Sequence, residues 1–139
     1  MEGTAPPRSQ DFNIRVTYRD TDQMGVVYYA NYLVYMESGR AEYMRARGWT
    51  YRDMEKDGYV LPVLHAECTY KTPAHYDDLL RVRAILETVT RVQVVFRYEI
   101  SREETGELLA TGMTRHAFVG LDMKLKRATP EVVARLLGE

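Results

Sequence analysis

The chain has 139 residues, of which 45% are hydrophobic and 28% charged, and its formal net charge is −1. These values are typical of one soluble globular domain with its own core, and the charge gives no reason to expect nucleic acid or an anionic membrane as a partner. No stretch approaches the length of a membrane span, and the single cysteine, Cys68, excludes an intrachain disulfide and agrees with a cytoplasmic location.

The N-terminal residues lack the hydrophobic region of a signal peptide. We expect residues 1–10 to form a disordered leader and residues 11–139 to form one domain. The domain then opens on an alternation of apolar and polar residues, which predicts a half-buried strand; its apolar members are Phe12, Ile14, Val16 and Tyr18.

An acidic loop leads from this strand to an amphipathic helix, which we expect from about Tyr32 to Arg47. Asn31 is the predicted N-cap and Gly48 the predicted C-terminal stop. The apolar residues of the helix repeat at spacings of three and four, and they are Tyr32, Met36, Gly39, Tyr43 and Ala46. The small Gly39 predicts that the helix backbone approaches a sheet closely.

After a short helix predicted from Trp49 to Lys56, the chain becomes rich in β-branched and aromatic residues. Four strands are expected, over Val60–Tyr70, Leu79–Thr90, Val92–Arg102 and Leu108–Leu121, before a terminal helix over Pro130–Leu137. Their short connections favour antiparallel pairing. The order of elements predicts an α+β fold in which one long helix packs on a five-stranded antiparallel sheet. Because one helix leaves sheet surface and edges uncovered, we expect a homodimer that can associate into a homotetramer.

The segment at residues 18–32, YRDTDQMGVVYYANY, is the most informative about chemistry. It places Asp22 shortly before the start of the long helix, where unpaired backbone N–H groups and the helix dipole stabilise negative charge on a reacting carbonyl oxygen. A carboxylate beside such a site suits the cleavage of an activated acyl bond. From composition alone a structural role is favoured, in which Asp20 and Asp22 build a turn and Gly25 supplies a positive φ angle.

Other residue patterns favour structural roles. Aromatic clusters such as the tyrosines at the helix start more often form core than pocket, although a hydroxyl at a cleft can contact an acyl group. The histidines lack metal-ligand spacing, and the sequence has no nucleophile-elbow serine or glycine-rich phosphate loop. We therefore expect neither a metal nor a cofactor.

Together these features resemble the hotdog-fold acyl-CoA thioesterases, and most of all the 4-hydroxybenzoyl-CoA and Tol–Pal-associated types. The family motif has Asp, two variable residues, Gly, two aliphatic residues, an aromatic, a variable residue, a small residue, Asn or Ser, and Tyr, which here is the segment from Asp22 to Tyr32. A second matching stretch, PAHYDDLL at residues 73–80, is similar to the family's turn between its second and third strands. The order of elements agrees from about Asp11 to the C-terminus.

The resemblance implies a hotdog fold, with the sheet wrapped around the long helix, and hydrolysis of an acyl-CoA to a free acid and CoA. It makes Asp22 the nucleophile or general base and the backbone N–H of Tyr29 the group that polarises the thioester carbonyl. The Tol–Pal-associated relatives usually carry His at position 29, so only the backbone role transfers.

The resemblance also implies substrate contacts, which it places at Gly25, Val26, Tyr28, Asn31, Tyr32, Glu37, Val63, His65 and Arg91. Val63 and His65 would come from the partner subunit of a continuous sheet, and Arg91 would meet the CoA phosphates. The acyl group stays open. Two other functions also stay open. One is a non-catalytic module that binds acyl-CoA or a protein. The other is a dehydratase or hydratase, which would need an Asp–His or His–Glu pair that the sequence does not display.

Overall fold

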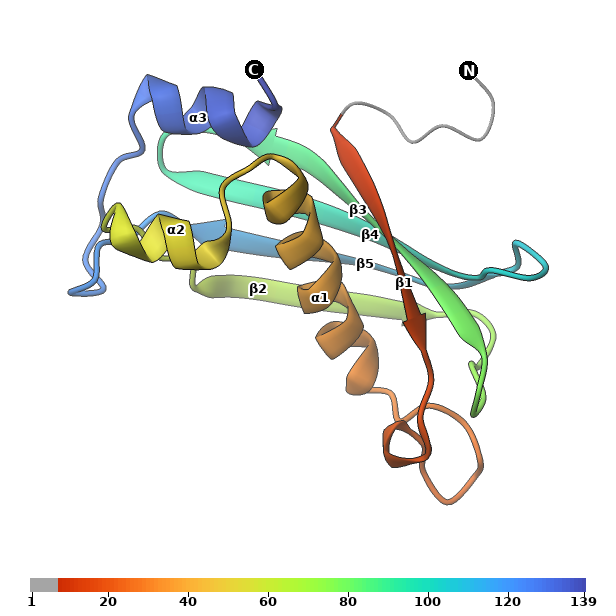
Figure 1. Ribbon diagram of the computed structural model, residues 1–139. Helices are drawn as coiled ribbons and strands as arrows, with labels where there is room; N and C mark the ends of the chain where they lie inside the picture. Colours follow the sequence, from red (N-terminus) through yellow and green to blue (C-terminus); the bar gives the residue numbers. More distant parts are fainter. Residues whose placement is uncertain (1–7) are drawn as a thin grey trace.

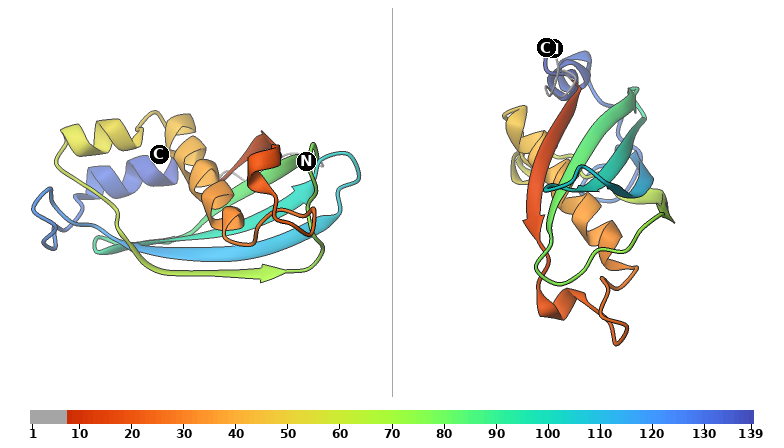
Figure 2. Two further views of the ribbon diagram at one scale, coloured as in Figure 1. Left: turned by 90° about the horizontal axis from the view of Figure 1, so that it is seen from below. Right: turned by 90° about the vertical axis from the view of Figure 1, so that its right-hand side faces the viewer.

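The structure, a computed structural model, describes residues 8–139, which form one antiparallel sheet with the long helix α1 (Asn31–Ala46) lying across one face (Figure 1). The strands lie side by side in the order β1 (Ser9–Arg15), β3 (Leu79–Val89), β4 (Gln93–Arg102), β5 (Leu108–Ala117) and β2 (Val63–Tyr70). The sheet curves around the helix (Figure 2). This confirms the expected α+β class, and the arrangement is the hotdog fold.

The helix α1 packs closely on β3 because Gly39 has no side chain. A Cβ atom at this position would lie 2.8 Å from Cγ1 of Val82, which is closer than carbon atoms pack. The buried face of the helix comprises Tyr32, Tyr35, Met36, Gly39, Tyr43 and Met44. The expected stripe is therefore correct except at its end, where Ala46, the last residue of the helix, is exposed and Met44 is buried instead.

The N-terminal end of α1 differs from the prediction, whereas its C-terminal end agrees with it. Ala30 is the N-cap and Asn31 the first helical residue, so the Asn31 amide does not cap the helix but donates to the carbonyl of Asp20 over 2.8 Å. At the other end, Gly48 has a φ angle of +77°, as expected of the residue that stops the helix.

The two short helices begin at threonine caps. The helix α2 (Tyr51–Lys56) starts later than expected because the Thr50 hydroxyl accepts from the backbone N–H of Asp53. The helix α3 (Pro130–Leu137) has the predicted bounds, with Pro130 in its first turn after the cap Thr129.

Several strand boundaries differ from the predictions. The strand β1 begins at Ser9, before the expected domain start, and residues 1–7 of the expected leader lie outside the described residues. It ends at Arg15, and Tyr18 instead belongs to a 3₁₀ turn, where its exposed ring stacks on Tyr76. The strands β2 and β5 are each shorter at one end, since Val60 pairs with Val119 only through an isolated bridge.

The strand β2 forms one edge of the sheet and is exposed along almost its whole length. Only Cys68 is partly buried, whereas Val63, Leu64 and Tyr70 are each about half exposed. Apolar side chains on an unpaired edge favour association with another strand. No helix within residues 8–139 combines the length and the apolar character that crossing a bilayer requires.

Candidate active site

The loop before α1 folds around Asp22. The Asp22 backbone N–H donates to the Val26 carbonyl over 2.9 Å, and the N–H of Gly25 donates to the Asp22 carbonyl over 3.0 Å. One carboxylate oxygen, Oδ1, accepts from the Met24 N–H over 2.8 Å, while Gly25 has a φ angle of +83°. Asp22 therefore does build a turn. Its second oxygen, Oδ2, accepts no hydrogen bond from the described part of the chain, so it stays available for chemistry.

The half-buried Asp22 lines a cavity of about 240 Å³ between this loop, the start of α1 and the end of β2. Most of the wall is apolar or aromatic, and it includes Val26, Tyr29, Tyr32, Tyr70 and Lys71. Such a site offers one carboxylate to a ligand that is otherwise held by apolar contact.

Tyr29 lines this cavity, and its backbone N–H is unused among the described residues. The N–H of Tyr28 donates to Asp20, and those of Asn31 and Tyr32 donate to the carbonyls of Tyr28 and Tyr29. By contrast, the Tyr29 N–H donates to no acceptor within residues 8–139. A free backbone N–H, here one residue before the N-cap of α1, is the type of donor that stabilises an oxyanion.

Three tyrosine rings make up the aromatic wall. The ring centroids of Tyr32 and Tyr70 lie 5.1 Å apart, and those of Tyr29 and Tyr70 lie 6.4 Å apart, both with edge-to-face geometry. The Tyr70 hydroxyl donates to the Tyr29 carbonyl over 2.9 Å, and the Tyr32 hydroxyl accepts from the Ala74 N–H over 3.1 Å. Burial raises the pKa of Tyr32. The Tyr70 bond holds the peptide between Tyr29 and Ala30, which follows the peptide that carries the free N–H.

Comparison with known proteins identifies the family. Residues 16–137 match the family model described as the Thioesterase-like superfamily. The chain belongs to this family. It is 37% identical to YneP of Bacillus subtilis (strain 168) over 85% of this chain and 88% of that protein, and 32% identical to the acyl-CoA thioesterase YbgC of Haemophilus influenzae over 88% and 89%. Among solved structures, the DHNA-CoA thioesterase of Staphylococcus aureus has a TM-score of 0.81 and 35% identity, over 86% of this chain and 80% of that one.

Not all residues expected from the thioesterase motif line the Asp22 cavity. Asp22, Val26, Tyr29 and Tyr32 do. Gly25 shapes the turn, and Asn31 holds the loop through Asp20. Tyr28 is exposed and packs its ring on that of Tyr29, with centroids 4.7 Å apart.

The remaining expected residues lie elsewhere in the thioesterase domain. Glu37 lines a second cavity, described below, and Val63 and His65 lie on the exposed edge strand β2, where Nε2 of His65 is 3.0 Å from Glu67. Arg91 follows β3 at the end of the sheet opposite the Asp22 loop (Figure 1), and its Nε donates to the Ala128 carbonyl over 2.7 Å. In a single protomer these four residues are not part of the Asp22 cavity.

Sequence reasoning missed Tyr70 and Lys71 as cavity residues. Tyr70 is the last residue of β2 and Lys71 follows it, shortly before the stretch at residues 73–80 that resembles the thioesterase family. That proximity was a usable signal. The antiparallel bridge between Val26 and His75, which brings the two motifs together, could not be derived from spacing.

Proposed function

We propose that this protein hydrolyses an acyl-CoA thioester to a free carboxylic acid and CoA, and that Asp22 is the catalytic carboxylate. The observation that carries the proposal is the presence, on one cavity, of a carboxylate with a free oxygen and a residue, Tyr29, with a free backbone N–H. The names of the relatives support the reaction class.

Two routes are consistent with this geometry. As a general base, Asp22 takes a proton from a water molecule while the water oxygen attacks the thioester carbonyl carbon. As a nucleophile, Asp22 attacks that carbon itself, and water then hydrolyses the mixed anhydride. In both routes the C–S bond breaks, CoA leaves as the thiolate and takes up a proton, and the Tyr29 N–H stabilises the charge on the carbonyl oxygen.

A homodimer would complete this site. Pairing β2 with β2 of a second copy would continue the sheet and cover the exposed Val63 and Leu64. It would also bring Val63 and His65 of the partner subunit toward the cavity, as the thioesterase resemblance implies. The aromatic wall suits an apolar or aryl acyl group, which agrees with the name of a relative from Synechocystis, 1,4-dihydroxy-2-naphthoyl-CoA hydrolase.

An assay of free-thiol release from acyl-CoAs with different acyl groups tests the proposal. Asp22→Asn removes the reactive oxygen, and we expect the rate to fall by roughly 10²–10⁴-fold, the usual contribution of a catalytic acid or base. Asp20→Asn is the matched control, because the Asp20 carboxylate accepts from the Thr17 N–H within the same loop but does not line the cavity. Undiminished turnover in Asp22→Asn would refute the role of Asp22. Tight binding without turnover by the unmodified protein would instead identify a binding module.

A further inference from the structure

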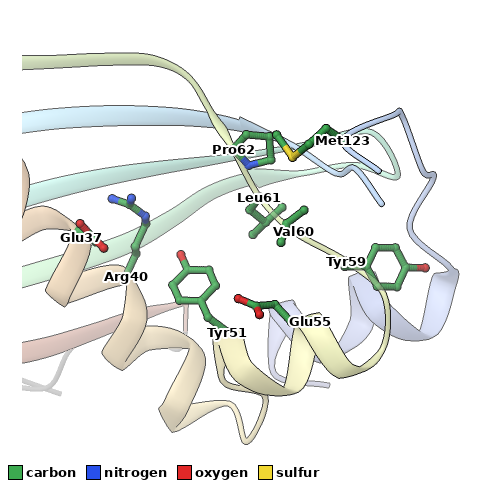
Figure 3. Close-up of a pocket in the computed structure, with 9 residues that line it drawn as sticks. All are labelled: Glu37, Arg40, Tyr51, Glu55, Tyr59, Val60, Leu61, Pro62 and Met123. Atoms are coloured by element: carbon green, nitrogen blue, oxygen red, sulfur yellow. The ribbon is translucent and has the colours of Figure 1, made fainter. Parts of the chain in front are cut away.

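A second cavity, of about 320 Å³, lies between α1, α2 and the segment that leads into β2 (Figure 3). Glu37 and Arg40 of α1, Tyr51 and Glu55 of α2, and Leu61 and Pro62 line it. It therefore lies at the start of β2, whereas the Asp22 cavity lies at the end of the same strand.

Arg40 is the unusual residue of this cavity. Its Nε atom is buried and makes no hydrogen bond to any residue from 8 to 139, and none of the carboxylates in that range forms an ion pair with it. The Tyr51 hydroxyl points toward the guanidinium (Figure 3). A largely buried cation without a counter-ion costs free energy, so an acceptor in the cavity that reached the guanidinium would stabilise it.

A chain of hydrogen bonds behind Arg40 has only one possible direction. The Leu61 carbonyl can only accept, so Nδ1 of the buried His116 donates to it over 3.1 Å. Burial, and then the charge of Arg40, lower the pKa of His116 to about 4, so the ring is neutral and its Nε2 accepts from the Thr114 hydroxyl over 2.8 Å. Thr114 must then accept from the hydroxyl of Tyr98 over 2.7 Å.

This direction has a consequence for Arg40. The phenol oxygen of Tyr98 has already donated its proton, so it can only accept from the neighbouring guanidinium. Burial lowers the pKa of Arg40, but the phenols of Tyr98 and Tyr51 raise it, and the net direction is upward. The network thus holds Arg40 as a cation without supplying a negative charge, and leaves the guanidinium to bind an acceptor in the cavity.

The geometry of β2 relates this cavity to the active site. In a symmetric antiparallel pair of β2 strands, a residue in the middle, Ala66 or Glu67, lies opposite its own copy. Leu61 and Pro62 of one protomer then lie beside residues 70–73 of the other. Since the first pair lines the Arg40 cavity and the second group lines the Asp22 cavity, the pairing places the two cavities side by side across the dimer.

We propose that Arg40 of one protomer binds the far end of the acyl group that Asp22 of the partner hydrolyses, and that it selects acyl groups ending in an oxygen acceptor. The inference rests on the proposed thioesterase function and on the β2 pairing. A hydroxyl and a carboxylate share the required acceptor chemistry. A hydroxyl could also donate to Glu37 or Glu55, whereas a carboxylate would neutralise the cation but lie near both glutamates.

The first test compares acyl-CoAs of equal chain length that end in a methyl, a hydroxyl or a carboxylate group. A hydrogen bond to a charged group predicts a kcat/KM that is about tenfold higher or more for an oxygen-ended ester than for the methyl-ended one. Comparison of the hydroxyl-ended ester with the carboxylate-ended ester identifies which acceptor Arg40 prefers. In Arg40→Gln the ratio should fall to about one or below, whereas Arg45→Gln, on the exposed face of the same helix, should keep the wild-type ratio. Arg40→Lys, which keeps the cation, gives an intermediate ratio and serves if Arg40→Gln does not fold.

The second test asks whether Arg40 acts across the dimer. Co-refolded Asp22→Asn and Arg40→Gln chains form mixed dimers in which the intact Asp22 faces Arg40 from the other chain. We expect the mixture to regain the preference for the oxygen-ended ester, since only Arg40→Gln chains retain the catalytic carboxylate.

Three outcomes overturn the inference. Equal or faster turnover of the methyl-ended ester by the wild type at every length overturns the selection, and a mixture that keeps the Arg40→Gln ratio overturns the action across the dimer. Normal turnover of methyl-ended esters in those cases leaves the proposed thioesterase function intact. Absence of thiol release from every ester refutes that function, and this inference with it.

Discussion

The surroundings of His116 predict how the folding stability of the protein changes with pH. The ring is fully buried, with both nitrogens engaged by Leu61 and Thr114, and its pKa is lowered from 6.5 to about 4 by burial and then by the charge of Arg40. Above pH 6.5 the ring is neutral in both states, so it has no effect on the pH dependence. Between pH 6.5 and about 4 only the unfolded chain gains the proton, so folding stability falls. At 1.36 kcal/mol per pH unit the loss approaches about 3 kcal/mol.

The perturbation that isolates this effect is His116→Gln, because an amide can bond the same two groups but does not titrate. Urea unfolding at a fixed protein concentration, from pH 7 to pH 4, gives the free energy of unfolding, and the fluorescence of the single, buried Trp49 reports it. The carboxylates titrate in both proteins, so the difference between the two curves contains the His116 contribution. We expect the wild type to lose about 3 kcal/mol more than the variant over this range. Parallel curves would refute the reasoning.

Three further substitutions test the packing and the assembly. In Gly112→Ala the new Cβ would lie 2.7 Å from Sδ of Met36 and 2.8 Å from the Glu67 carbonyl oxygen, so overpacking should lower stability by about 1–3 kcal/mol in thermal unfolding; an unchanged Tm would contradict this. Tyr43→Phe removes the buried hydroxyl that donates to the Leu136 carbonyl over 2.7 Å, and calorimetry should show a loss of about 1–3 kcal/mol, in contrast to the near-zero effect expected if water replaced the bond. Ala66→Glu places two added like charges at or beside the centre of paired β2 strands, so light scattering should find more monomer than in the wild type; an unaltered mass would argue against pairing through β2.

The sequence predicted the order and type of the major elements because its apolar periodicity is strong. Alternation identified the first strand, β-branched and aromatic residues identified the other four, and Gly39, which allows the close approach to the sheet, was visible in the helix stripe. Boundaries were less accurate where a local hydrogen bond decides them, as at the Thr50 cap of α2. The first strand was predicted to include Tyr18, which instead stacks on Tyr76. This contact joins segments far apart in the sequence, so local alternation could not reveal it.

The candidate site was predictable only in part for the same reason. The motif from Asp22 to Tyr32 is local, so the carboxylate and the free N–H of Tyr29 could be expected together. Tyr70 reaches the cavity through the strand order, and the isolation of Arg40 depends on a network that joins α1 to β4 and β5. No spacing in the sequence encodes these long-range contacts.

A single-turnover experiment tests the central claim most directly, because it separates cleavage from binding. Enzyme in excess is mixed with an acyl-CoA that the wild type hydrolyses, and free thiol is followed over time for the wild type and Asp22→Asn. The account predicts that Asp22→Asn still binds the ester but releases thiol roughly 10²–10⁴-fold more slowly. Release at the wild-type rate from the bound ester would contradict it.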